Sequence, residues 1–346
     1  MEFPQRLVFD SSDSEDDAAA ALKAALGSLG LADPLVVTSV HGKRLASLLG
    51  GIQVTPDAGA DQAWAAEIGS RAHRSGAGVI VAVGGGRCLD VAKLAAARAG
   101  LKLIAAPTQL SHDGICSPIA VVPNESGRAE SIGALAPHAV FLSIPTLVGA
   151  PAPSLRAGIG DLLANPLSLR DWKLAIDRGL EDPNTDAWEL SVESYARIEK
   201  YLDEDPAAWV HDVDAVHRLA DALILSGTAM IRAGTSRPAS GGEHEISHAI
   251  DEIFSGRALH GAQVAFGCVV SVSLYGDDTE AFRRRLGRLE LPHHPAELGL
   301  SLDDVVRVLL EAPGTRPGRY TILEAADLDA TTARALVSRI WPDLSV

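Results

Sequence analysis

The chain has 346 residues, of which 47% are hydrophobic and 22% charged, and this composition excludes a disordered or fibrous protein. At about 150 residues per domain, the length predicts two domains. The formal net charge of −15 excludes non-specific binding to nucleic acid or to an anionic membrane, because both would repel the chain.

No segment has the pattern of a signal peptide or of a membrane helix. The most apolar windows, 79–83 and 262–272, are far shorter than the roughly 20 residues that cross a bilayer. Cys88, Cys116 and Cys268 are too few and too scattered for a disulfide framework, which favours a reducing compartment. We therefore expect a cytoplasmic protein.

The first half of the chain alternates strand and helix signals. Strands are expected at 35–38, 79–83 and 101–105, and helices at 43–49, 60–75 and 88–99. The continuous apolar run Val79–Val83 is typical of a strand that is buried on both faces of a parallel sheet. This rhythm predicts an α/β, Rossmann-like domain over residues 1–150. We expect Ser11–Asp17 to be a solvated loop or a helix start, and Thr108–Pro118 to be a polar loop.

The second half changes character after three closely spaced prolines, Pro145, Pro151 and Pro153, which indicate a linker. Strand signals almost vanish from this point, and helical patterns replace them. Helices are expected at 155–179, 186–203, 212–234, 242–254, 261–275 and 302–311. The pattern predicts an all-α domain over residues 151–346, with a cleft between the two domains.

A glycine-rich turn is the sharpest motif of the first half. Gly84, Gly85 and Gly86 follow the buried strand and open the next helix. Without Cβ atoms the backbone can approach a ligand, and the helix N-terminus suits a pyrophosphate. No Walker motif follows, so the turn favours a dinucleotide over ATP. A tight turn without any ligand is the alternative.

The loop Pro107–Pro118 follows another expected strand, at the sheet edge where open α/β sheets bind ligands. Its side chains are hydroxyls, an imidazole and a carboxylate. These groups suit the nicotinamide amide and a polyhydroxy substrate. A polar surface loop is the alternative.

Two overlapping patterns in the helical half could bind a metal. Asp161, His244 and His260 offer one carboxylate and two imidazoles, which suit a catalytic Zn²⁺ or Fe²⁺ site. His244 to His248 also fits His-Glu-x-x-His, the zinc-protease signature, with Glu245 as its general base. The extended protease motif is absent, and a glycine-rich βαβ half does not belong to the usual protease architecture.

Together the motifs resemble the sn-glycerol-1-phosphate dehydrogenase branch of the iron-containing alcohol dehydrogenase and dehydroquinate synthase-like superfamily. The resemblance covers roughly residues 30 to 275. Four segments in chain order carry it: Val83–Lys93, Pro107–Pro118, Gly160–Trp172 and Arg237–Gly261. It implies the dehydroquinate synthase-like fold, a parallel-sheet domain followed by a helical one.

The resemblance also implies a role for individual residues. The metal ligands would be Asp161, His244 and His260. The pyrophosphate and ribose of NAD(P)H would lie against Gly84, Gly85, Gly86 and Asp90, and the nicotinamide end against the loop of Thr108, Ser111 and Ser117. The substrate hydroxyls would lie near the catalytic candidates Asp113 and His248.

The function expected from this resemblance is metal-dependent, NAD(P)H-linked interconversion of a keto phosphate and a hydroxy phosphate. Dihydroxyacetone phosphate and sn-glycerol 1-phosphate are the first pair, and a homo-oligomer is expected. The alternatives are an NAD-using cyclase similar to dehydroquinate synthase, a polyol or alcohol dehydrogenase, a His-Glu-x-x-His metalloprotease, and a binding protein that has lost its metal. The family pattern is broken at Pro166–Ser168 and at Gly242, which puts the substrate in doubt.

Cations near these motifs carry two further expectations. Arg237, with Arg232 behind it, is the nearest candidate to bind an anionic substrate, although either could be a structural ion pair. Lys43 and Arg44 follow the strand 35–38 at the turn where an acidic residue would repel a 2′-phosphate. We therefore expect NADPH to be accepted at least comparably to NADH.

Overall fold

The computed structural model describes residues 4–9, 14–55, 60–123, 127, 129–203 and 212–345. Residues 11–13 of the predicted acidic segment lie outside this description. Ser14 caps helix α1 (Glu15–Ser28), because its side chain accepts a hydrogen bond from the Asp17 backbone N–H. Three acidic residues in the first turn complement the positive end of the helix dipole, so this part of the segment is a helix start.

Six parallel strands form one sheet in the order β1-β8-β5-β4-β2-β3. Their bounds are β1 (Gln5–Phe9), β2 (Pro34–Thr38), β3 (Ile52–Val54), β4 (Val79–Gly84), β5 (Lys102–Pro107) and β8 (Ala139–Ser143). The three predicted strands, which correspond to β2, β4 and β5, are confirmed. The sequence analysis missed the edge strands β1 and β3 and the inner strand β8.

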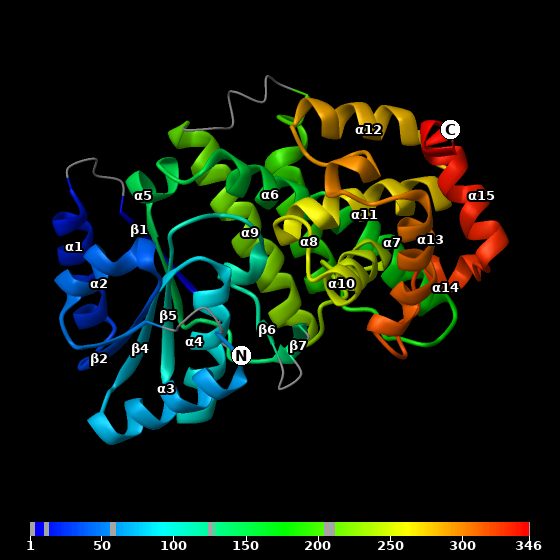
Figure 1. Cartoon of the computed structure of the whole chain (residues 1–346). Helices are drawn as coiled ribbons and strands as arrows, with labels where there is room; N and C mark the ends of the chain where they lie inside the picture. Colours follow the sequence, from blue (N-terminus) through cyan, green and yellow to red (C-terminus); the bar gives the residue numbers. More distant parts are fainter. Residues whose placement is uncertain are drawn as a thin grey trace.

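Strand β4 shows why its sequence is apolar throughout. Val79, Val81 and Val83 pack in the cluster that contains α1 and α2 (Lys43–Leu49). Ile80 and Ala82 pack in the cluster that contains α3 (Gln62–Ser75) and α4 (Gly86–Ala99). The sheet is therefore covered by helices on both faces, as Figure 1 shows, and the strand has no solvated side.

A two-stranded antiparallel hairpin, β6 (Ile119–Pro123) and β7 (Ala129–Gly133), lies outside the main sheet. It follows the predicted polar loop, which contains only the short 3-10 turn Asp113–Ile115. The buried Lys93 of α4 anchors the hairpin, because its ammonium donates to the Ile119 carbonyl at 2.8 Å. The sequence analysis did not predict this hairpin.

Beyond Ser143 the described residues contain helices and no strand. The helices are α5 (Ile144–Val148), α6 (Ala152–Leu162), α7 (Asn165–Asp177), α8 (Thr185–Glu199), α9 (Val213–Ala233), α10 (Gly242–Phe254), α11 (His260–Leu274), α12 (Thr279–Arg288), α13 (Leu302–Glu311), α14 (Ile322–Ala326) and α15 (Ala330–Ile340). The helices predicted at 242–254 and 302–311 have the predicted bounds. The single helix predicted over 155–179 was wrong: α6 ends at Leu162 and α7 begins at Asn165, because Pro166 has no N–H to continue α6 and lies instead in the first turn of α7.

The sheet lies on the left of Figure 1 and the helices from α6 onward lie to its right. The domain boundary at residue 150 and the homo-oligomer stay predictions. Among the described residues, no helix combines the length and the apolar character that a membrane span requires.

Candidate active site

Three helices bring the predicted metal ligands together. Asp161 lies at the end of α6, His244 in the first turn of α10, and His260 at the start of α11. One ligand atom from each lies within 4.8 Å of the others. Asp161 Oδ1 is 3.7 Å from the Nε2 atom of each histidine, and it is buried without a hydrogen-bond partner among the described residues. An unpartnered carboxylate oxygen that faces two imidazole nitrogens is a donor set that fits Zn²⁺ or Fe²⁺.

Two glycines allow these ligands to meet. A Cβ atom on Gly160 would lie 2.4 Å from the Gly261 carbonyl oxygen, and a Cβ on Gly261 would lie 1.9 Å from the Ala157 carbonyl oxygen. The backbones of α6 and α11 are therefore in direct contact. Because Asp161 and His260 are the chain neighbours of these glycines, the helix crossing itself positions both side chains.

Further hydrogen bonds orient the cluster. Glu243 Oε1 lies 3.0 Å from His244 Nδ1 and also accepts from the Gly241 N–H at 2.6 Å and from the Ser168 hydroxyl at 2.8 Å. An Nδ1–H that donates to Glu243 leaves the Nε2 lone pair of His244 toward Asp161. The sequence analysis missed Glu243. It noted Ser168 only as a departure from the family pattern. The Ser168 hydroxyl donates a hydrogen bond to the Glu243 carboxylate and so helps to hold it in place.

The charges of the cluster are strongly shifted. Burial lowers the pKa of His244, but the adjacent carboxylates of Asp161 and Glu243 outweigh it and raise the pKa to about 9. Burial lowers the pKa of His260 to about 3, against the attraction of Asp161. Burial opposes ionisation of Asp161, yet the surrounding imidazoles bring its pKa below the usual range. The cluster thus favours a positive charge beside Asp161.

A cavity of about 210 Å³ lies between the glycine turn and the metal cluster. Seven predicted site residues line it: Gly86, Asp90, Asp113, Ser117, His244, His248 and His260. Asp161 is not among the residues that line the cavity and is only 4% exposed. Gly84, Gly85, Thr108 and Ser111 are close in the chain but are not among the lining residues.

The glycine turn is required by packing as well as by any ligand. A Cβ on Gly86 would lie 2.4 Å from His112 Nε2, and Gly85 begins α4 without a side-chain cap. The first N–H groups of α4 are therefore available at the cavity. Asp90 also has a structural role, because it pairs with Lys93 at 3.1 Å and accepts from the Val121 N–H at 3.1 Å.

Asp113 and His248 face the cavity from opposite halves of the chain. Asp113 accepts a 2.8 Å hydrogen bond from Ser226, while burial and the nearby charge of Asp161 raise its pKa to about 7. His248 Nε2 is 2.9 Å from Arg316 Nη2. A guanidinium only donates, so this nitrogen accepts and the ring proton is on Nδ1. Burial and Arg316 lower the pKa of His248 well below its usual value.

Arg237 and Arg232 do not face the cavity. Arg237 is 1% exposed, pairs with Glu181 at 2.6 Å and donates to the Tyr320 carbonyl, and Arg232 pairs with Asp186. The ion-pair interpretation therefore holds for both residues. Two arginines line the cavity, the exposed Arg87 and the half-buried Arg316, and the sequence analysis assigned a role to neither; the more buried one is Arg316. The available signal was a basic turn, Thr315-Arg316-Pro317-Gly318-Arg319, in an acidic chain.

The structure weakens the expectation that both Lys43 and Arg44 favour binding of the 2′-phosphate of NADPH. Arg44 Nε lies 3.1 Å from Glu15 Oε2, so a carboxylate of α1 already balances its charge. Lys43 is exposed at the start of α2. The NADPH prediction therefore depends on Lys43.

The His-Glu-x-x-His pattern does not form a protease site. Glu245 is fully buried, and its Oε2 accepts a 3.0 Å hydrogen bond from Thr321, the residue that precedes α14. It is not among the residues that line the cavity. Glu245 therefore cannot activate a water at the cluster, and His248 is not one of the three clustered ligands.

Comparison with known proteins identifies a family and several relatives of this chain. Residues 16–151 match the model of the family described as iron-containing alcohol dehydrogenase. The glycerol-1-phosphate dehydrogenase [NAD(P)+] of Cenarchaeum symbiosum is 38% identical over 75% of this chain and 72% of its own length. The enzyme of the same name from Methanocorpusculum labreanum is 33% identical over 94% of this chain and 92% of its own.

Solved structures share the fold at lower identity. A probable glycerol dehydrogenase from Sinorhizobium meliloti superposes with a TM-score of 0.78 at 23% identity, covering 99% of this chain and 97% of the other. Glycerol dehydrogenase from Schizosaccharomyces pombe gives a TM-score of 0.75 at 18% identity, covering 99% and 91%. These likenesses confirm the predicted α/β plus helical architecture.

Proposed function

The chain belongs to the glycerol-1-phosphate dehydrogenase family of iron-containing alcohol dehydrogenases, and from this premise we propose that it transfers hydride between NAD(P)H and a small keto phosphate. It is an NAD(P)-dependent oxidoreductase. Dihydroxyacetone phosphate is the first candidate substrate and sn-glycerol 1-phosphate the corresponding product. The observation that supports this assignment is one cavity lined both by the N-terminus of α4 and by the histidines of the cluster.

We assign the metal to Asp161, His244 and His260, as Zn²⁺ or Fe²⁺. When bound there, the cation would act as a Lewis acid on the substrate oxygen. The residues of the chain prepare this position in advance. Glu243 holds the His244 ring with Nε2 toward Asp161, and the Asp113 backbone N–H donates to Asp161 Oδ2 at 2.9 Å, which leaves Oδ1 for the cation.

We assign the cofactor to the other wall of the cavity. The nicotinamide would supply the hydride, as the cofactor does in such enzymes. The free N–H groups at Gly85 and Gly86 would hold the pyrophosphate at the helix N-terminus. Ser117 lines the cavity, and with Thr108 and Ser111 of the same loop it would contact the nicotinamide.

Asp113 and His248 are assigned to the substrate hydroxyls, because both line the cavity beside the cluster. Asp113 can accept through its carboxyl oxygens. His248 can donate through Nδ1, because Arg316 already occupies Nε2. The two residues would orient the substrate so that one face of its carbonyl meets the cofactor.

The direct test is NADH and NADPH oxidation with dihydroxyacetone phosphate, dihydroxyacetone and simple aldehydes as substrates. The protein is loaded separately with Zn²⁺ and with Fe²⁺. We expect the phosphorylated ketone to be reduced with the highest kcat/KM. Release of phosphate without net consumption of NAD(P)H would support the cyclase instead, and a preference for unphosphorylated substrates would support a polyol or alcohol dehydrogenase.

A further inference from the structure

A guanidinium without an acidic partner lies at the cavity wall. Arg316 is half-buried in the loop that joins the 3-10 turn Ala312–Thr315 to α14. Its Nη2 contacts the Ser131 hydroxyl at 3.3 Å and His248 Nε2 at 2.9 Å, and its Nη1 contacts the Ser236 hydroxyl at 3.4 Å. Within the described part of the chain, no carboxylate forms a salt bridge with it.

Many of the described arginines form salt bridges with acids. Arg237 pairs with Glu181 at 2.6 Å, and the more exposed Arg285 pairs with Asp203 at 3.0 Å. A cation removed from water is costly unless an anion or several acceptors compensate it. The hydrogen-bond partners of Arg316 are two hydroxyls and a neutral ring, and the nearby Glu245 carboxyl is itself kept neutral by burial. The compensating charge can therefore come from a ligand in the cavity that Arg316 lines.

A second arginine strengthens the positive potential at this point. Arg319 Nη2 donates to Ser236 Oγ at 2.9 Å, and Nη1 donates to the Ser240 carbonyl. Burial, together with Arg316 and Arg237, lowers the pKa of Arg319 to about 10, which still leaves it charged at neutral pH. Because Ser236 accepts from Arg319, its own hydroxyl hydrogen is free to point at an anion.

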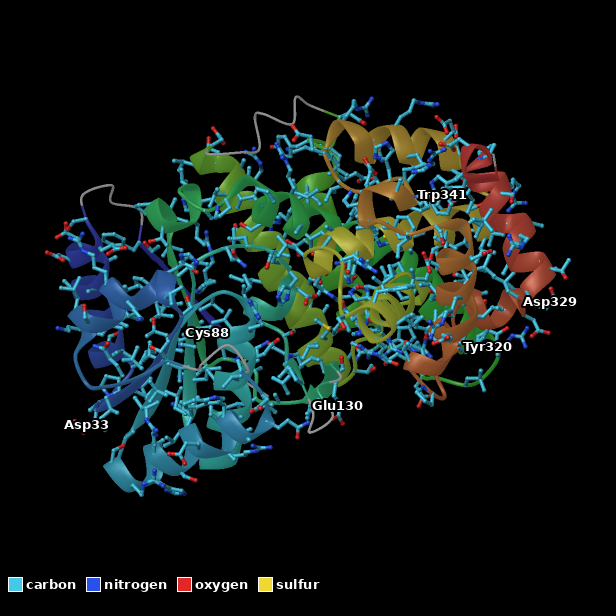
Figure 2. The ribbon with its side chains drawn as sticks, in the orientation of Figure 1. Asp33, Cys88, Glu130, Tyr320, Asp329 and Trp341 are labelled. Carbon is cyan, nitrogen blue, oxygen red and sulfur yellow. The ribbon has the colours of Figure 1, made fainter. Side chains whose placement is uncertain are left out.

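The position of Arg316 relative to the cluster fits a short substrate. His248 separates the two, with its ring centroid 6.0 Å from that of His260 on one side and its Nε2 against Arg316 on the other. A ligand whose carbonyl oxygen faces the cluster would therefore reach Arg316 with a group about one imidazole ring away. The subsite also joins both halves of the chain, since Ser131 belongs to β7. Figure 2 labels its neighbour Glu130, and also Tyr320, which follows the arginine loop.

We propose that Arg316, with the hydroxyls of Ser131 and Ser236, binds the phosphate dianion of the substrate and so selects phosphorylated over unphosphorylated ketones. This inference rests on the proposed function for the identity of the substrate. A guanidinium offers parallel N–H donors that match two phosphate oxygens, and the serines supply neutral donors beside it. In a chain with a net charge of −15, such a local site is what allows an anion to bind.

The test compares Arg316→Gln with Arg307→Gln in the Zn²⁺-loaded protein. Glutamine keeps a donor for His248 but removes the charge, and Arg307 is a matched control on the surface of α13, where it pairs with Glu311. We expect Arg316→Gln to raise KM for dihydroxyacetone phosphate roughly 10- to 100-fold, as loss of a charge-assisted pair implies. The kcat/KM for dihydroxyacetone should stay within about threefold of the wild type. Calorimetry should show that binding of inorganic phosphate is lost only in Arg316→Gln.

Ser131→Ala is the second variant, because it removes one donor without disturbing the arginine loop. A severalfold rise in KM for the keto phosphate alone is expected. An unchanged KM and unchanged phosphate binding in both Arg316→Gln and Ser131→Ala would overturn the subsite and leave the proposed function standing. A rise in KM for NADPH or NADH alone would assign Arg316 to the cofactor and also overturn it. If the wild type reduces no keto phosphate, yet inorganic phosphate binds and Arg316→Gln abolishes that binding, the subsite stands and the proposed function fails.

Discussion

The two walls of the cavity are built from different chemistry. On the wall next to the sheet, the N-terminus of α4 presents backbone N–H groups, and the glycines there have no side chain to block them. On the wall formed by the helices, side chains converge from α6, α10 and α11, which are far apart in the sequence. The first wall is a local property of one turn. The second exists only because three helices pack in one arrangement.

This difference means that opposite kinds of substitution should damage the two walls. Removing a side chain should disable the helical wall, and adding one should disable the glycine turn. Metal content and cofactor affinity report on the two walls separately.

His260→Ala should break the helical wall alone. We expect a loss of bound metal and a fall in kcat of at least about 1000-fold, because one of three ligands is removed. His260 is partly exposed at the start of α11, so the fold should survive. Elemental analysis, steady-state kinetics and circular dichroism measure the three quantities. Unchanged metal content and activity would remove His260 from the site.

Gly86→Ala should break the other wall alone. Its Cβ would lie 2.4 Å from His112 Nε2, so the imidazole or the turn must shift where the first N–H groups of α4 meet the cavity. We expect KM for NAD(P)H to rise roughly 10-fold or more, since anion binding at a helix N-terminus depends on this geometry. The bound metal should remain at the wild-type level. Loss of metal in this variant would show that the two walls are not independent.

Glu243→Gln should weaken the helical wall without removing a ligand. The amide can still accept from the Ser168 hydroxyl, but it no longer offers a charged acceptor to His244 Nδ1. Loss of such an orienting carboxylate typically lowers metal affinity about 10- to 100-fold. Competition with a chromophoric chelator gives the dissociation constant directly. Ser168→Ala, which removes only one donor to Glu243, should have a smaller effect in the same direction.

Glu245→Gln should have the smallest effect on catalysis. Burial and Glu324 raise the pKa of Glu245 from an ordinary 4.5 to about 9, so its carboxyl is neutral at pH 7 and an amide resembles it. Kinetic constants should stay within about twofold of the wild type.

The same substitution makes a prediction about stability. The folded state keeps the Glu245 proton between pH 4.5 and about 9, whereas the unfolded state has lost it. The wild type therefore loses stability relative to Glu245→Gln as pH rises through this window. Urea unfolding of both proteins at pH 5 and pH 8 checks the sign. A wild type that gains stability relative to the variant at the higher pH would show that Glu245 is ionised in the fold.

How much of this structure the sequence could reveal depends on how local each signal is. The run Val79–Val83 predicts a strand that is buried on both faces, because every one of its residues is apolar. Helix α10 was predicted with its observed bounds. Strand β8 was missed because it continues directly into α5, with no turn residue between Ser143 and Ile144 to mark its end. The break before α7 was missed because the apolar pattern continues on both sides of it, although Pro166 signals the break.

The site residues also divide into those that a local sequence pattern identifies and those that it does not. Motifs identified the three clustered residues, because each keeps its local pattern. The loop that contains Arg316 is recognisable in the sequence only as basic. Arg316 lies at the cavity because this loop packs against β7 and α10. Glu243 is adjacent to His244 in the chain, but its role depends on Ser168 from another helix. Such contacts follow from tertiary packing, which no local pattern contains.

The direct crossing of α6 and α11 has a consequence for the entropy of metal binding. Gly160 and Gly261 hold the two backbones together beside Asp161 and His260, so these ligands are confined before any cation arrives. Binding then orders little of the chain, unlike a zinc finger, in which the metal must offset the conformational entropy of a folding polypeptide. The heat capacity change on metal binding should accordingly be small. Removal of the metal by a chelator should therefore leave the chain folded.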